Sequence, residues 1–246
     1  MNDQGAGVAH CFRCGLVETL QGFDSRYGDG TMTRSKHFPG KILHESMSCF
    51  GRDLWASCKA LEGVALDYLL ARNCVIPPQD GHLRYHPALR HPVSGITGPA
   101  LVALVSHATT GLPLTLHRTW IQADGHKAMV APPRMFLGGH RKAGGVVRLW
   151  PDDAVTLGLG IAEGIETALS LAHAFTPVWA CLDANNLATL SVPMGVESLL
   201  IAADNDQVGI DAARTCGVRW SEAGREVRIA TPDGDGADLN DLASAI

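Results

Sequence analysis

GIAEGIETAL, residues 160–169, and LLIAADNDQVG, residues 199–209, decide the fold that this sequence predicts. Both stretches begin with a continuously apolar run, reach acidic residues, and then change to the three- and four-residue apolar spacing of a helix. Glu163 follows the first apolar run, whereas Asp204 and Asp206 follow the second. Continuously apolar strands that alternate with helices through short loops indicate a parallel sheet with both faces covered.

The alternation of strand and helix continues over the last third of the chain, where we therefore expect an α/β fold. The expected strands span residues 155–162, 177–182, 198–203 and 226–230, and the expected helices span residues 164–175, 184–190, 208–223 and 238–245. In an open α/β sheet, the carboxyl ends of the strands form a common binding crevice. The acidic residues should lie at that edge.

Carboxylates at such an edge suit a divalent cation. Neighbouring carboxylates repel each other unless a cation lies between them, and oxygen ligands favour Mg²⁺ or Mn²⁺. Glu163, Asp204 and Asp206 are the catalytic and metal-binding candidates. We expect the carboxyl group of Glu163 to lie roughly 4–8 Å from the Asp pair, the span that one or two shared ions bridge.

The same acidic residues also suit purely structural roles. Glu166 is either a second carboxylate near the site or a first-turn helix charge favoured by the helix dipole. The sequence Asp-Asn-Asp before Gln207 also has the composition of a surface turn, and Asp206 has the position of a helix N-cap. In GADLNDL, residues 236–242, Asp238 either adds a carboxylate to the metal site or caps the last helix.

The 246-residue chain has a net charge of −5 that is unevenly distributed. Residues 1–150 contain 16 Lys and Arg against 10 Asp and Glu, a balance of +6, and residues 151–246 contain 4 against 15, a balance of −11. A basic part joined to an acidic part suggests that one binds phosphates while the other holds cations. Chance surface composition is the alternative.

The basic part shows two patterns. Residues 50–73 have the apolar spacing of an amphipathic helix or of a helix pair broken at Gly63. Residues 82–150 contain short apolar runs divided by Gly- and Pro-rich turns, which predict an antiparallel sheet. Candidates for contacting a nucleic acid or a nucleotide are its basic residues Arg84, His86, Arg118, Lys127, Arg134, Lys142 and Arg148.

For any one of these basic residues a solvated surface charge is the alternative, but as a set they favour a nucleic-acid face. Trp120, two residues after Arg118 in LHRTWI, is a candidate for stacking on a base. Arg118 and Lys127 are the preferred pair, because they lie in the segments that most resemble a known family.

The order Glu, then Asp-x-Asp, then a late Asp resembles the Toprim domain of bacterial-type primases, type IA and II topoisomerases and some nucleases. LRYHPALRHP, PALVALV, LHRTWI, GGVVRL, AEGIETALSLA, AADNDQVGIDAA and ADLNDL extend the resemblance over roughly residues 50–246, to Toprim primase-like proteins of plasmids, phages and mobile elements. The resemblance implies metal-binding roles for Glu163, Asp204 and Asp206, and makes Asp238 the late acidic position.

The expected architecture is an α/β Toprim domain with a parallel, Rossmann-like sheet at residues 154–246, preceded by a smaller mixed α+β primase-like domain at residues 50–153 and by a poorly specified segment at residues 1–49. The expected activity is RNA primer synthesis on single-stranded DNA from nucleoside triphosphates, with Mg²⁺ or Mn²⁺ as cofactor and a replicative helicase as a candidate partner. A Toprim nuclease and a non-catalytic nucleic-acid-binding or partner-binding remnant are the alternatives.

The N-terminal segment departs from this family pattern. HCFRCG, residues 10–15, resembles the second half of a zinc ribbon, with Cys11 and Cys14 as two zinc ligands, but no Cys or His precedes His10. A structural zinc site normally has four ligands, so we expect the ribbon to be incomplete. Seven scattered cysteines argue against a disulfide framework. The absence of a secretion signal and of any apolar run of membrane-spanning length predicts a cytoplasmic protein.

Overall fold

The computed structural model describes residues 7–10, 17–20, 43–233, 236–237 and 239–240. The chain forms two compact units, Met1–Leu43 and His44–Ile246. In the first unit, β1 (Gly7–His10) and β2 (Val17–Leu20) pair as antiparallel strands. The predicted zinc ligands Cys11 and Cys14 lie outside the described residues.

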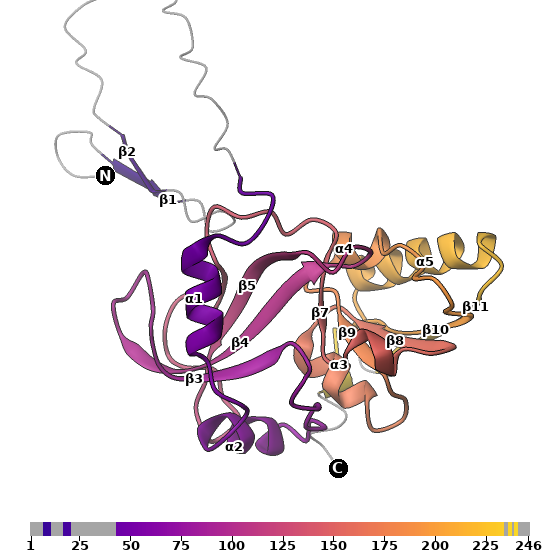
Figure 1. The fold of residues 1–246 in the computed structure, drawn as a ribbon, viewed down its shortest axis with the longest axis horizontal. Coiled ribbons are helices and arrows are strands. Elements are labelled where there is room, and N and C mark those ends of the chain that lie inside the picture. Colours follow the sequence, from indigo (N-terminus) through magenta and orange to yellow (C-terminus); the bar gives the residue numbers. More distant parts are fainter. Residues whose placement is uncertain (1–6, 11–16, 21–42, 234–235, 238, 241–246) are drawn as a thin grey trace, which may run out of the picture. The chain divides into compact units, whose positions relative to one another are not determined.

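The second unit contains the strands and helices predicted up to residue 230 (Figure 1), whereas the predicted helix at residues 238–245 lies largely outside the described residues. The strands of its first part are β3 (Leu83–Arg90), β4 (Thr97–His107), β5 (Pro113–Trp120), β6 (Arg134–Phe136) and β7 (Gly145–Arg148). The strands of its second part are β8 (Gly158–Ala162), β9 (Val178–Ala180), β10 (Ser198–Ala202) and β11 (Glu226–Ala230). The helices are α1 (Cys49–Ser57), α2 (Val64–Ala71), α3 (Ile165–Leu171), α4 (Ala184–Ala188) and α5 (Gln207–Glu222), with a 3₁₀ turn at Asp152–Ala154.

Within the described residues, all nine strands of this unit join one sheet in the order β11-β10-β8-β9-β7-β4-β5-β6, with β3 also paired to β4. Strands β3 to β7 pair antiparallel, and β8 to β11 pair parallel. The two parts meet where β7 pairs antiparallel with both β4 and β9. The predicted antiparallel sheet and the predicted parallel sheet are both confirmed, and they are continuous.

Local sequence explains where the first two helices begin and end. The Ser48 hydroxyl caps α1 by accepting a hydrogen bond from the Gly51 backbone N–H at 3.3 Å. Gly63 precedes α2 with φ +49°, a backbone conformation that side-chain-bearing residues rarely adopt. The predicted helix pair broken at Gly63 is therefore confirmed.

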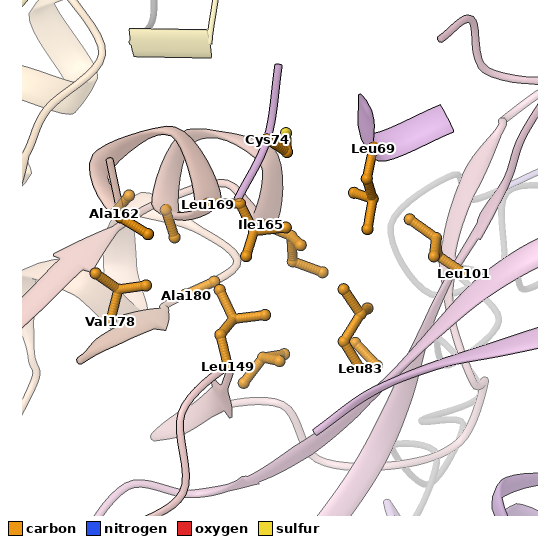
Figure 2. Close-up of a cluster of buried hydrophobic side chains, with 14 of the residues drawn as sticks. Leu69, Cys74, Leu83, Leu101, Leu149, Ala162, Ile165, Leu169, Val178 and Ala180 are labelled. Carbon is orange, nitrogen blue, oxygen red and sulfur yellow. The ribbon is translucent and has the colours of Figure 1, made fainter. Parts of the chain in front are cut away.

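Helices cover both faces of the parallel strands. Apolar residues of α4 and α5 pack on one face, with Leu187, Ala213, Cys216 and Trp220 buried against Leu159, Ile161 and Ile201. Helix α3 packs on the other face, where its buried residues join those of α2 and of the antiparallel strands in one cluster. Figure 2 shows Leu69 of α2 and Leu101 of β4 in the same cluster as Leu169 of α3 and Val178 of β9.

A third cluster lies under α1, on the opposite face of β4 and β5. Both faces of this antiparallel part are therefore covered by helices. No helix among the described residues is long and apolar enough to cross a membrane. The predicted boundary at residues 153–154 falls in the 3₁₀ turn and interrupts neither the sheet nor the shared cluster, and it stays a prediction.

Candidate metal site at the carboxyl ends of the parallel strands

Three neighbouring parallel strands end in register at one edge of the sheet. The last residue of β8 pairs with the last residues of both β9 and β10. Glu163 follows β8 directly, Asp183 comes shortly after β9, and Asp204 comes shortly after β10. Because β8 lies between β9 and β10, Glu163 has an acidic neighbour on each side.

Glu163 lies in a field of like charges. Its side chain is half-buried, and among the described residues no hydrogen-bond donor is directed to its carboxylate. Burial raises the pKa of Glu163 above its ordinary value, and the charges of Asp204 and Asp183 raise the pKa further. Asp206 acts in the same direction, whereas Arg134 acts in the opposite direction. Such a carboxylate gains most from a cation beside it.

The Asp-Asn-Asp loop is fixed by the helix that follows it. Asp206 is the N-cap of α5 and accepts a hydrogen bond from the Gly209 backbone N–H at 2.7 Å, which confirms the predicted capping role. A Cβ at Gly209 would lie 2.7 Å from the Asp204 carbonyl oxygen. The first turn of α5 therefore packs so closely on this loop that glycine is needed there.

The middle residue of that loop anchors the late acidic segment. The Asn205 N–H donates to the Ala237 carbonyl at 2.8 Å, and its carbonyl accepts from the Gly236 N–H at 2.7 Å. The buried Asn240 side chain donates from Nδ2 to the Arg72 carbonyl at 2.8 Å. Gly236 and Ala237 are thus held beside the Asp-Asn-Asp loop, and the predicted ligand Asp238 lies outside the described residues.

Asp183 is an acidic residue at this edge that was not among the predicted site residues. Its carboxylate caps α4 through the Asn186 N–H at 2.8 Å and accepts from Lys142 Nζ at 2.8 Å. Leu182, just before it, has φ +71° and donates its N–H to the Glu163 carbonyl at 2.7 Å. The signal in the sequence was the same as at the other sites, an apolar run followed by Asp, but β9 is only three residues long.

Glu166 does not lie with the acidic edge. It is in the first turn of α3, as predicted, but its side chain is buried between α3 and α2. Its carboxylate accepts a hydrogen bond from the Tyr68 hydroxyl at 2.8 Å and lies 3.7 Å from Lys127 Nζ. Burial acts to raise the pKa of Glu166, but Lys127 and the other donors outweigh it and hold this pKa below its ordinary value.

Three of the predicted basic residues lie near the acidic ones. Arg134 of β6 is exposed and its charge acts on Glu163, while its side chain has no hydrogen bond or ion pair with a described residue. Lys142 pairs with Asp183 and lies 5.1 Å from the centre of the Phe136 ring. Lys127 is the third, because it forms an ion pair with Glu166 of α3.

Other predicted basic residues have structural contacts. Arg118 is 7% exposed, donates to the Phe136 carbonyl at 2.9 Å, and has its pKa lowered by burial to about 10. Arg84 is half-buried, with its guanidinium 4.2 Å from the centre of the Trp55 ring. Arg148 is 4% exposed and donates to Ser106 Oγ at 2.6 Å. In this conformation Arg118 and Arg148 present no charge at the surface.

The expected base-stacking role of Trp120 is wrong for this structure. Its ring is 1% exposed, and its indole N–H donates to the Leu89 carbonyl at 2.9 Å. The ring packs against the edge of the His91 ring, with 4.5 Å between the centroids. Trp120 is therefore part of the cluster under α1.

The donor set fits a hard divalent ion in an open site rather than a closed cage. Within the described part of the chain, no group of three or more His, Cys, Asp or Glu side chains is arranged to hold a metal ion. The preformed cluster expected from the sequence is thus absent there. Mg²⁺, however, keeps several waters and needs only one or two protein carboxylates together with substrate phosphates. Glu163, repelled by its neighbours and accepting no hydrogen bond from the described residues, suits that mode.

Family models match both parts of the second unit. Residues 158–245 match the model described as "Toprim domain", and residues 47–149 match the model described as "Domain of unknown function (DUF7146)". No curated protein matches the chain.

The solved structures that are similar include primases. The zinc-binding and RNA polymerase domains of the Aquifex aeolicus primase align with 16% identity and a TM-score of 0.49, over 78% of this chain and 55% of that one. A primase domain from Pseudomonas aeruginosa aligns with 15% identity and a TM-score of 0.41, over 75% and 56%. The primase fragment of the bacteriophage T7 primase-helicase protein aligns with 15% identity and a TM-score of 0.45, over 96% and 85%. The chain spans little more than half the length of the two bacterial proteins.

Proposed function

We propose that this chain, in which residues 158–245 are a Toprim domain, is a metal-dependent nucleotidyltransferase of the DNA-primase type. It would make RNA primers on single-stranded DNA during replication of a plasmid, phage or mobile element. The observation that carries the proposal is Glu163, an unpartnered carboxylate among the described residues, flanked by Asp183 and Asp204 at the ends of three parallel strands.

The acidic edge would bind the metal. Glu163, Asp204, Asp206 and Asp238 are the proposed ligands of Mg²⁺ or Mn²⁺. Asp206 uses one carboxylate oxygen to cap α5, which leaves the other for a ligand. The ion, when bound, would activate the primer 3′-hydroxyl and neutralise charge on the attacked phosphate.

The basic residues around this edge would bind phosphates. Arg134 is suited to binding the triphosphate because its guanidinium is exposed and has no ion pair with a described residue. Its charge also acts on Glu163, so the two side chains belong to the same site. Lys142, on the other side, is pre-positioned by Asp183. The +6 balance of residues 1–150 would supply the wider attraction for single-stranded DNA. A replicative helicase as partner and a cytoplasmic location belong to the same proposal.

Incubation of the protein with single-stranded template, nucleoside triphosphates and Mg²⁺ or Mn²⁺ tests the proposal. We expect short RNA products that disappear with Glu163→Gln and with Asp204→Asn. Glu197→Gln is the matched control, because Glu197 is exposed and precedes β10 at the opposite end of the strands. Shortened template would instead indicate a nuclease, and retarded but unchanged template a binding module; either result contradicts primer synthesis.

A further inference from the structure

A buried asparagine of α4 holds the loop that carries Lys142. This loop, the Lys142 loop, spans residues 138–144 between β6 and β7. The Asn186 side chain is 3% exposed; its Oδ1 accepts a hydrogen bond from the Gly144 backbone N–H at 3.0 Å, and its Nδ2 donates to the Lys142 carbonyl at 3.1 Å. Because a backbone N–H only donates and a carbonyl only accepts, these partners also fix the orientation of the amide. Both polar ends of one buried side chain are therefore bonded to the backbone of the loop.

The Lys142 loop is also fixed on either side of this asparagine contact. Toward its start, the Arg141 N–H donates to the His44 carbonyl at 3.0 Å. At its end, the Gly144 carbonyl accepts from the Ala108 N–H at 2.9 Å, and Gly144 has φ +74°, which glycine adopts without strain. Lys142 thus lies between two points that are tied to other parts of the fold.

The ammonium group of Lys142 lies at the acidic edge. It donates to Asp183 Oδ2 at 2.8 Å and lies 5.1 Å from the centre of the Phe136 ring. The residue before Asp183, Leu182, donates its backbone N–H to the Glu163 carbonyl at 2.7 Å, so the ion pair is next to the end of β8. An ammonium group has three N–H donors, and Asp183 takes one. The others are available to a phosphate.

The ion pair alone would hold Lys142 weakly. The side chains of Lys142 and Asp183 are 37% and 26% exposed, and solvent screens such a pair. A lysine side chain is long and flexible, and ordering it on binding lowers affinity. A fixed backbone reduces that loss. Asp183 also accepts the Asn186 N–H at 2.8 Å, so the group that orients the ammonium and the group that holds the loop belong to one turn of α4.

We propose that Asn186 is a positioning residue that clamps the Lys142 loop onto α4 and so keeps the Lys142 ammonium group at the acidic edge, where it receives the phosphates of a nucleoside triphosphate. The identity of the ligand rests on the proposed function. The clamp itself is a property of the ligand-free protein.

Limited trypsin digestion of the full chain, without metal or nucleotide, tests the clamp. Trypsin cleaves after Arg141 and Lys142 when the loop opens, so the rate follows the population of the open loop. Asn186→Ala removes both hydrogen bonds and should speed this cleavage at least about fivefold. Asn185→Ala is the matched control, because Asn185 also lies in α4 but is exposed, and its side chain has no hydrogen bond with a described residue.

Cleavage after Arg118, which is buried in β5, reports on opening of the whole fold in the same digests. We expect Asn186→Ala to speed cleavage of the Lys142 loop much more than cleavage after Arg118. Equal acceleration at both places would mean a general loss of stability, and equal rates in Asn186→Ala and Asn185→Ala would mean that no clamp exists. Either result would overturn the proposal.

Binding of ATP in Mg²⁺ gives the second readout. Asn186→Ala should weaken ATP binding about fivefold, the cost of ordering one long side chain on binding. Lys142→Met should weaken it at least about tenfold, because a hydrogen bond from a charged group is lost. In the Lys142→Met background, Asn186→Ala should have no further effect, since the clamp acts through the lysine. The same loss in both backgrounds would contradict a positioning role.

If Asn186→Ala does not fold, Gly144→Ala replaces it. A Cβ at Gly144 would lie 3.2 Å from His107 Nε2, and φ +74° disfavours alanine, so this change strains the loop and leaves α4 as it is. We expect faster cleavage of the loop and weaker ATP binding, and parent-like results in both would overturn the proposal. If Lys142→Met binds ATP as the parent does, the proposed function of Lys142 is wrong, and the digests still decide whether Asn186 holds the loop.

Discussion

At the scale of one residue, the surroundings of Glu163 should lower the stability of the metal-free protein. Its pKa is raised in the fold, because of burial first and then of its acidic neighbours. The favourable contribution of a group with a raised pKa is present below its unfolded pKa and is lost as the pH rises through its folded pKa. At neutral pH, ionised Glu163 therefore opposes folding unless a cation is bound.

Glu163→Gln should accordingly raise the free energy of unfolding of the metal-free protein at pH 7. The gain should disappear near pH 4, where the carboxyl group of the parent is largely protonated. Urea unfolding in EDTA at the two pH values measures the difference. Saturating Mg²⁺ should narrow the gap at pH 7, because the ion stabilises only the protein that keeps the carboxylate. If Glu163→Gln is less stable than the parent at pH 7 in EDTA, the acidic neighbours do not destabilise ionised Glu163 in the fold.

Burial limited what could be predicted for single residues. The segment HRTW, residues 117–120, alternates between the two faces of β5. In a sheet with one solvated face, half of these side chains would reach solvent. Here Arg118 and Trp120 share the face of β5 that α1 covers, and both are buried; α2 covers the other face, where Thr119 is buried as well. That second layer comes from distant segments, and no local pattern contains it.

At the scale of elements, α5 offers a matched pair of glycines. Gly209 packs on the Asp204 carbonyl, where a Cβ would lie at 2.7 Å, whereas a Cβ at Gly217 would meet only Val227 Cγ1 at 3.4 Å and Ile229 Cδ1 at 3.7 Å. Gly209→Ala should cost about 1–3 kcal/mol of stability by forcing the backbone apart. Gly217→Ala should be neutral or gain up to about 1 kcal/mol from helix propensity.

Thermal or urea unfolding of the two alanine variants checks this difference. Gly209→Ala should also displace the Asp-Asn-Asp loop and weaken Mn²⁺ binding, whereas Gly217→Ala should leave the affinity unchanged. Equal stability of the two variants would show that the first turn of α5 yields to the added methyl group.

The elements of the parallel part were predictable because each signal was local. The expected strands and helices from residue 155 to residue 230 are present, with ends that differ by a few residues. Asp183 was missed although the expected strand at residues 177–182 placed it directly after an apolar run, the same local signal as at Glu163 and Asp204. Asp206 was predicted both as a ligand and as a cap, and the structure confirms the cap.

At the scale of the whole molecule, charge should separate DNA binding from chemistry. Arg134→Ala should weaken binding of single-stranded DNA and reduce its salt dependence, by about 0.7 in the slope for one lost phosphate contact. Arg118→Ala should leave that slope unchanged and instead lower stability by about 1–3 kcal/mol, because its guanidinium is buried on a carbonyl.

Fluorescence anisotropy over a range of salt concentrations measures both slopes. Glu163→Gln should retain DNA binding, since it removes a negative charge. If Arg118→Ala gives a folded protein whose DNA binding loses as much salt dependence as that of Arg134→Ala, the proposed assignment of DNA binding to Arg134 is wrong.

The way the two parts join was not predictable from local patterns. Strand β7 spans only Gly145–Arg148, yet it pairs with both β4 and β9 and so makes one sheet from two. Its partner in β9 lies more than 30 residues further along the chain. The turn near residue 153 separates the two parts in the sequence, and nothing in its composition signals that strands on either side of it pair.

Strand β4 has a consequence for how slowly the protein opens. It is paired along one edge with β5 and along the other with β3 and then β7, and Val102 and Val105 are fully buried. Amide hydrogens in such a strand exchange with solvent only when a large part of the molecule opens. In deuterium oxide, the amides of β4 should therefore be among the last to exchange. Those of β11, at an edge of the sheet with exposed Ile229, should exchange orders of magnitude sooner.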